Sequence, residues 1–333
     1  MKTKERNYGI DIIKIIAVIL VVAIHFFLHT EYYTFTNGGG LGIKIQSIIR
    51  NFCMICVPLF MITTGFLNKK TEYNKSFFKG LFNVLLVWFF YSLIEYFVIN
   101  SINGDFNKFN IIDLVNSITS FKACYYSWYI EMYIGLYLLS PIINNAYNSF
   151  DKKNRFITVL ILIIILILPV SFNIIFNGMV HLPNWWSSIY PLAYYICGKY
   201  ISDIKPKFKK KNLILLLILC QIFTLSLNYI GDISHAALPI FISSLLVFLI
   251  FYDISIKNTK LQKIVSYTSN ITLDIYLGSS LIDRILYPIF NAKSNSMGVT
   301  QQYAILYAPI ILIIVFIISF IYASIRKLII NVR

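Results

Sequence analysis

One apolar stretch, residues 11–29, carries the side chains best suited to chemistry, namely an acid, an amine and an imidazole. Asp11, Lys14 and His25 stand in a run that is long enough to cross a bilayer as an α-helix. A helix turns about 100° and rises about 1.5 Å per residue, so Lys14 and His25 lie within roughly 20° of each other and about 16 Å apart along the axis. Asp11 falls within roughly 60° of both. Charged groups at membrane depth normally face a bundle interior or a wet cavity, so this stripe predicts a polar tunnel containing a histidine.

A structural interpretation of the same three residues stands beside the functional one. Asp11 and Lys14 lie in the first turns of the stretch and could extend to the lipid headgroups. His25 could simply donate a hydrogen bond to a neighbouring helix. The common stripe of His25 and Lys14 favours the functional interpretation.

The composition indicates a polytopic helical membrane protein. The chain has 333 residues, of which 58% are hydrophobic and 13% charged, with a mean hydropathy of +0.72. Apolar runs of about 20 residues recur, and each is long enough to span a bilayer. The five cysteines show no disulfide framework, and the CxxC pair Cys53 and Cys56 stands alone within an apolar run.

These runs predict an all-α bundle of about ten transmembrane helices that forms one membrane domain over residues 1–333. Lys and Arg concentrate in alternate connections, which places both termini in the cytoplasm and the chain in the cell membrane as a multi-pass protein. The formal charge of +15 then reflects topology, and we expect no nucleic-acid partner. The expected spans are 10–29, 43–67, 79–99, 127–147, 156–176, 185–203, 213–231, 236–256, 270–291 and 303–325.

Further polar residues occur near the outer ends of the expected spans. Arg50 lies roughly 10 Å into the second span and so close in depth to His25. Glu95 and Glu131 lie near the outer ends of the third and fourth spans, and Trp128 begins the fourth. The spacing of His25 and His29 resembles half a metal site, but no third ligand has matching spacing, so no metal is expected.

Three interpretations of other polar residues depend on local spacing alone. Asp283 and Arg284 are adjacent and point about 100° apart, so each either pairs with another helix or faces the cavity. Lys199 and Asp203 are four residues apart, which favours a local ion pair. His181 and His235 fall in outer connections, where we expect them to be solvated.

Three stretches together resemble the integral-membrane acyltransferase-3 family, whose members acylate extracytoplasmic carbohydrate. In DIIKIIAVILVVAIH at 11–25, Lys14 takes the place of the usual arginine, and ten residues separate it from His25. VPLFMITTGFL at 57–67 is similar to the family's Val-Pro-Leu-Phe segment with a following small-residue–Gly turn. WYIEMYIGLYLLSPII at 128–143 resembles the segment that opens the family's fourth span. The replacement of arginine matters because lysine lacks the planar guanidinium fork.

The resemblance implies a membrane O-acyltransferase that takes an acyl group from cytoplasmic acyl-CoA, with acetyl-CoA first and a succinyl donor next. No permanently bound cofactor is expected. The acceptor would be a hydroxyl of an extracytoplasmic cell-surface glycan or lipid-linked saccharide. His25 would act as general base and Arg50 would stabilise the oxyanion, while Lys14 and Asp11 would contact the donor.

The remaining candidate residues lie near the outer ends of the expected spans. Trp128, Glu131 and Glu95 are the candidates for acceptor binding. Membrane lipid is an expected partner, and a homo-oligomer or a synthase complex is left open. The competing interpretation is a transporter or exporter of a small polar solute or glycan, because buried charges also mark substrate pathways in transporters.

Overall fold

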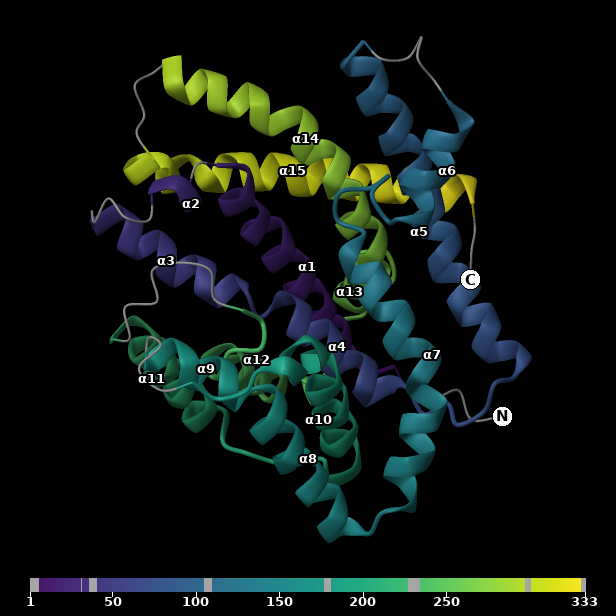
Figure 1. Ribbon diagram of the computed structural model, residues 1–333, viewed down its shortest axis with the longest axis vertical. Coiled ribbons are helices and arrows are strands. Elements are labelled where there is room, and N and C mark those ends of the chain that lie inside the picture. Colours follow the sequence, from purple (N-terminus) through teal and green to yellow (C-terminus); the bar gives the residue numbers. More distant parts are fainter. Residues whose placement is uncertain are drawn as a thin grey trace. The chain divides into compact units, whose positions relative to one another are not determined.

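The computed structural model describes residues 6–30, 32–35, 41–104, 110–176, 181–226, 234–296 and 301–330 (Figure 1). Within these ranges the chain forms helices and turns, and no strand occurs. The all-α prediction is therefore confirmed for this part of the chain. The first five and last three residues lie outside it, as does the glycine run 38–40.

The chain divides into two compact units. Unit 1 comprises Met1–Lys69 and Asn145–Asn270, and unit 2 comprises Lys70–Asn144 and Ile271–Arg333. Both units contain segments from distant parts of the sequence, so neither could be recognised from a local boundary. The single functional domain over 1–333 stays a prediction.

Unit 1 contains most of the helices. Its helices are α1 (Tyr8–His29), α2 (Tyr32–Phe35), α3 (Leu41–Cys53), α4 (Cys56–Leu67), α8 (Lys152–Leu166), α9 (Leu168–Ile175), η3 (Trp185–Ile189), α10 (Tyr190–Ile204), α11 (Lys210–Ser226), α12 (Leu238–Phe251) and α13 (Thr259–Asn270). Unit 2 contains α5 (Lys75–Ile102), α6 (Ile111–Thr119), α14 (Thr272–Ser296), α15 (Gln301–Ile329) and most of α7 (Trp128–Ser149).

Five segments of the described chain are long and apolar enough to cross a membrane. They are Tyr8–His29, Leu41–Leu67, Lys75–Ile102, Lys152–Ile175 and Tyr303–Ile329. Each overlaps an expected span, which supports a membrane protein. The other expected spans coincide with shorter or more polar helices, so ten transmembrane helices and the cytoplasmic termini stay predictions.

The second expected span is interrupted, because α3 ends at Cys53 and α4 begins at Cys56. Pro58 has no amide hydrogen, so it cannot donate to the Met54 carbonyl four residues earlier. That carbonyl instead lies 2.9 Å from the ring Nδ1 of His235, which stacks on Tyr190. His235 is therefore half-buried and hydrogen-bonded and not fully solvated as expected, while His181 is exposed as expected.

The closest helix contact in unit 1 depends on two glycines, Gly65 of α4 and Gly198 of α10. A Cβ atom at Gly65 would overlap the Tyr195 carbonyl oxygen and lie 2.7 Å from its carbon. A Cβ atom at Gly198 would lie 2.8 Å from the Ile62 carbonyl carbon. Small residues allow helix backbones to approach closely in membrane proteins. These two glycines therefore fix how α4 packs on α10.

Candidate active site

Helix α1 presents the predicted stripe in unit 1. Asn7 caps the helix by accepting a hydrogen bond from the Ile10 amide, and the helix then continues without interruption to His29. His25 is 8% exposed, whereas Lys14 is half-buried. No hydrogen-bond acceptor for the Lys14 amine occurs in the described ranges. The helix thus holds a buried imidazole and a half-buried lysine about 16 Å apart along one face.

Asp11 has direct partners other than Lys14. Its carboxylate accepts two hydrogen bonds from Arg6, at 2.5 and 3.1 Å, and one from the Ser269 hydroxyl at 2.7 Å. Arg6 also donates to the side-chain oxygen of Asn270, at 3.1 Å. A carboxylate held by a guanidinium in this way is strongly fixed. Asp11 therefore anchors the beginning of α1 to α13, and Lys14 is left without a direct ion pair to it.

Arg50 is buried in α3, with 1% of its surface exposed. Its Nε donates to the Tyr33 hydroxyl at 3.2 Å, and its Nη1 donates to the Asn51 side chain at 3.3 Å. The guanidinium carbon lies 5.4 Å from the centre of the Tyr33 ring, within the range of a cation–π interaction. Since α3 packs against α1, the scaffold of unit 1 carries both Arg50 and His25.

Comparison with known proteins identifies the family to which this scaffold belongs. A family model described as an acyltransferase domain, Acyl_transf_3, matches residues 7–324. The chain belongs to the acyltransferase-3 family. The matched region is described as an acyltransferase domain, and five of the described helical segments are long and apolar enough to cross a membrane.

Curated relatives add a more distant similarity. Two proteins named amino-acid racemase, both from Enterococcus faecalis, match this chain. One is 25% identical over 252 residues, which cover 70% of this chain and 34% of the relative. The other is 28% identical over 134 residues, which cover 38% of this chain and 18% of the relative. The chain thus spans about a third or less of these relatives, and no solved structure matches it.

The acyltransferase-3 motifs acquire a physical explanation from the helices that contain them. The resemblance predicts a small-residue–Gly turn at the end of the 57–67 segment. Helix α4 instead continues past Gly65 to Leu67. The lack of a side chain at Gly65 admits the backbone of α10. Pro58 in the same segment separates α4 from α3.

Glu95 lies in unit 2 and is 1% exposed. One carboxylate oxygen accepts hydrogen bonds from the Tyr125 amide at 3.2 Å and the Ser280 hydroxyl at 2.9 Å. The same oxygen lies 3.2 Å from a guanidinium nitrogen of Arg284, whose side chain is 35% exposed. Arg284 therefore pairs across helices, which was one of its two expected roles. The contribution of Glu95 to acceptor binding stays a prediction.

The other two acceptor candidates lie on the surface of α7. Trp128, the first residue of α7, is 43% exposed, and Glu131, about one turn later, is also exposed. Asp283, in contrast, is fully buried and accepts a hydrogen bond of 2.6 Å from the Tyr126 hydroxyl. Exposed Trp128 and Glu131 are accessible to a ligand, while Asp283 serves the packing of unit 2.

Several ion pairs were not predicted from the sequence, and two of them join distant segments of the chain. Asp274 and Arg326 form a buried pair at 2.5 Å, and the Tyr91 hydroxyl donates to Asp274 at 3.2 Å. In unit 1, Asp203 pairs with Arg155 at 3.0 Å, so the expected local pair with Lys199 is wrong. In each pair the two residues come from distant segments of the chain. Only their opposite charges could have suggested the pairs from the sequence.

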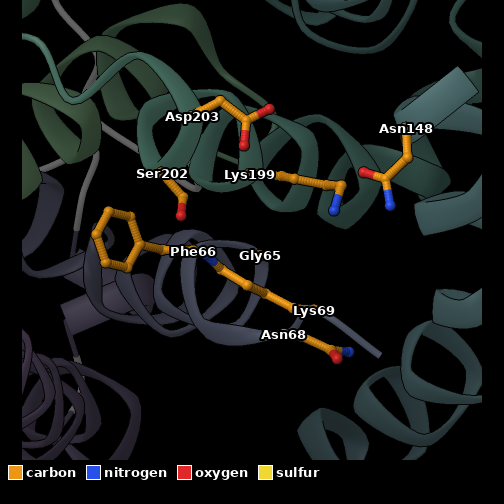
Figure 2. Close-up of a pocket in the computed structure, with 8 residues that line it drawn as sticks. All are labelled: Gly65, Phe66, Asn68, Lys69, Asn148, Lys199, Ser202 and Asp203. Atoms are coloured by element: carbon orange, nitrogen blue, oxygen red, sulfur yellow. The ribbon is translucent and has the colours of Figure 1, made fainter. Parts of the chain in front are cut away.

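A small pocket of about 100 Å³ opens where α4 and α10 end (Figure 2). Its lining is mostly polar and comes entirely from unit 1. The lining residues are Gly65, Phe66, Asn68, Lys69, Asn148, Lys199, Ser202 and Asp203. Figure 2 shows the Lys199 side chain extending toward Asn148.

Proposed function

We propose that this protein moves an acyl group from cytoplasmic acyl-CoA to a hydroxyl of an extracytoplasmic glycan or lipid-linked saccharide. Acetyl is the first candidate for the acyl group and succinyl the second. The observation that carries the proposal is the buried His25, which shares a face of a membrane-length helix with Lys14 in an acyltransferase-3 chain. The excess of Lys and Arg in alternate connections supports a donor on the cytoplasmic side.

His25 would be the general base. A neutral imidazole accepts the proton of the acceptor hydroxyl near pH 7, as that oxygen attacks the carbonyl carbon of the thioester. The tetrahedral intermediate then collapses and the carbon–sulfur bond breaks. The imidazolium returns its proton to the departing thiolate, so the products are the ester and free CoA, and His25 is regenerated.

Arg50 would stabilise the oxyanion that forms on the thioester carbonyl. The guanidinium is already held by Tyr33 and Asn51, and a donor fixed before the reaction needs little reorganisation when charge develops. Burial strengthens the interaction, because the local dielectric constant is low. Removal of one such donor typically lowers kcat about 10²–10³-fold.

Lys14 would contact the donor nearer the cytoplasm. Its amine is half-buried and lacks an acceptor in the described ranges, so it is available to a polar or anionic part of acyl-CoA. Its separation from His25, about 16 Å along the helix, is comparable to the length of a pantetheine arm. The arm would bridge the two residues.

The second candidate function is transport of a small polar solute or glycan through the same path. It is favoured by the placement of Lys14 within a membrane-length helix. The racemase names describe proteins of which this chain spans about a third or less, so racemisation is not part of either proposal.

Purified protein in detergent, given acyl-CoA with a radiolabelled acyl group and a panel of glycan acceptors, tests the proposal. We expect label on the glycan, and a loss of about 10²–10⁴-fold in turnover for His25→Ala, which is the usual contribution of a general base. His29→Ala, one turn away on the same helix, is the matched control and should retain turnover. Solute uptake into vesicles without label transfer would instead support transport.

A further inference from the structure

The pocket between the ends of α4 and α10 contains a buried amine. Lys199 is 6% exposed, and its Nζ lies 5.2 Å from the centre of the Tyr147 ring. No hydrogen-bond acceptor for this amine occurs in the described part of the chain. A buried ammonium normally pairs with an acceptor or an anion, because it loses its hydration. The amine therefore points to a ligand that supplies the acceptor.

The single acid that lines the pocket is already neutralised. Asp203 pairs with Arg155 at 3.0 Å, and Arg155 also donates to the carbonyl of Asn148 at 3.0 Å. Lys69, which also lines the pocket, is exposed and has no ion pair within the described ranges. Asp203 still attracts Lys199, but two lysines beside one carboxylate that Arg155 already binds leave an excess of positive charge around the pocket. The pocket is suited to an anion.

The polar lining and the size of the pocket narrow the class of anion. Asn148 and Ser202 offer an amide and a hydroxyl donor beside the two amines. A volume of about 100 Å³ is large enough to accommodate a phosphate group. A phosphate has several acceptor oxygens and more than one negative charge. Two lysines and two neutral donors match that chemistry.

Contacts within unit 1 relate the pocket to α1. Phe66 of the pocket lining packs on Tyr252, with ring centres 6.1 Å apart. A Cβ atom at Gly9, in the first turn of α1, would lie 2.7 Å from the Tyr252 carbonyl carbon. The pocket is therefore at the Lys14 end of α1 and not at the His25 end. The same end is the one at which a cytoplasmic donor would enter.

We propose that this pocket binds a phosphate group of the acyl donor, with Lys199 and Lys69 as its cationic contacts. The proposal rests on acyl-CoA being the donor. The phosphate fixes the nucleotide end outside the bundle, while the pantetheine arm extends along α1 toward His25. A phospholipid headgroup carries the same chemistry, and the experiment separates the two sources.

The test measures CoA binding by isothermal titration calorimetry, with the full chain in nanodiscs of uncharged lipid. We expect Lys199→Gln to weaken CoA binding about ten-fold, which is the loss of one charge-assisted hydrogen bond. Lys69→Gln, at an exposed position that tolerates substitution, should weaken it in the same direction. Lys199→Arg keeps the charge and should retain most of the affinity. Lys153→Gln, an exposed lysine of the neighbouring helix, is the matched control and should bind as the wild type does.

The outcomes distinguish a phosphate of the acyl donor from a phospholipid headgroup. Equal CoA affinity in wild type, Lys199→Gln and Lys69→Gln overturns the pocket proposal but leaves the acyl-CoA donor intact. A wild type that does not bind CoA overturns the donor and the pocket's role together. Lysine-dependent binding to vesicles containing phosphatidylglycerol, without CoA binding, would assign the phosphate site to lipid and overturn its place in donor recognition.

Discussion

Gly65→Ala adds one methyl group to the closest helix contact of unit 1. Gly65 does not adopt a left-handed backbone conformation, so alanine is compatible with the backbone itself. The effect is therefore steric. The added carbon would overlap the carbonyl oxygen of Tyr195, which belongs to the backbone of α10 and cannot rotate away as a side chain could.

The distances give the size of the effect. The new Cβ would lie 2.7 Å from the Tyr195 carbonyl carbon, whereas carbon atoms pack at about 3.5–4.0 Å. Helices α4 and α10 must therefore separate by roughly 1 Å. Overpacking of this kind costs about 1–3 kcal/mol, and alanine regains up to about 1 kcal/mol through its higher helix propensity. Because two whole helices must move, we expect a net loss of about 2 kcal/mol.

Thermal unfolding of the detergent-solubilised protein measures this loss. A loss of about 2 kcal/mol corresponds to a decrease in Tm of roughly 3 °C, because an unfolding entropy of about 2.1 cal/mol/K per residue amounts to about 0.7 kcal/mol/K for 333 residues. Gly135→Ala in α7 is the matched control, since no heavy atom lies within 4 Å of its added Cβ. It should leave Tm unchanged or raise it. A Gly65→Ala protein that melts at or above the wild-type temperature would refute the close approach of α4 and α10.

Three further predictions concern buried groups. Asp274→Asn leaves Arg326 facing a neutral amide and should lower the free energy of unfolding by about 3–5 kcal/mol. Asp274→Leu combined with Arg326→Met should recover most of that stability. An Asp274→Asn protein as stable as wild type would contradict the buried pair. Burial raises the pKa of the Cys124 thiol, so little thiolate forms at pH 8. We therefore expect N-ethylmaleimide to modify Cys124 only after unfolding, as measured by mass spectrometry. Equal labelling of folded and denatured protein would contradict the burial of this thiol. Arg50→Lys keeps the charge but loses the fork, so kcat should fall about 10²–10³-fold with donor KM little changed; an unaltered kcat in the labelled-acyl assay would exclude Arg50 from the oxyanion site.

Composition and periodicity were sufficient for the helical class and for the position of α1. The expected span 10–29 nearly coincides with Tyr8–His29, because the apolar run and its polar flanks are local properties. The same reasoning missed the interruption at Met54–Ile55. The effect of Pro58 on the preceding turn could have been predicted, but the histidine that takes the freed carbonyl lies far along the chain.

The spacing of charged residues in the sequence did not predict which of them form ion pairs with one another. Asp203 has Lys199 four residues away on its own helix, yet it pairs with Arg155 of α8. Asp274 pairs with Arg326, which was expected to lie beyond the last span. Helix periodicity gives the face on which a charge lies, but tertiary packing decides what meets that face. For the same reason the sequence did not predict the pocket at Lys199.

Transfer of label across a sealed membrane tests the central claim most directly. Proteoliposomes with a defined protein orientation would hold acyl-CoA, labelled in its acyl group, on the side of the Lys14 end of α1, and a glycan acceptor on the opposite side. We predict that label appears on the glycan, that free CoA stays on the donor side, and that His25→Ala abolishes both without changing insertion. Transfer that persists in His25→Ala, or that requires donor and acceptor on the same side, would contradict the account.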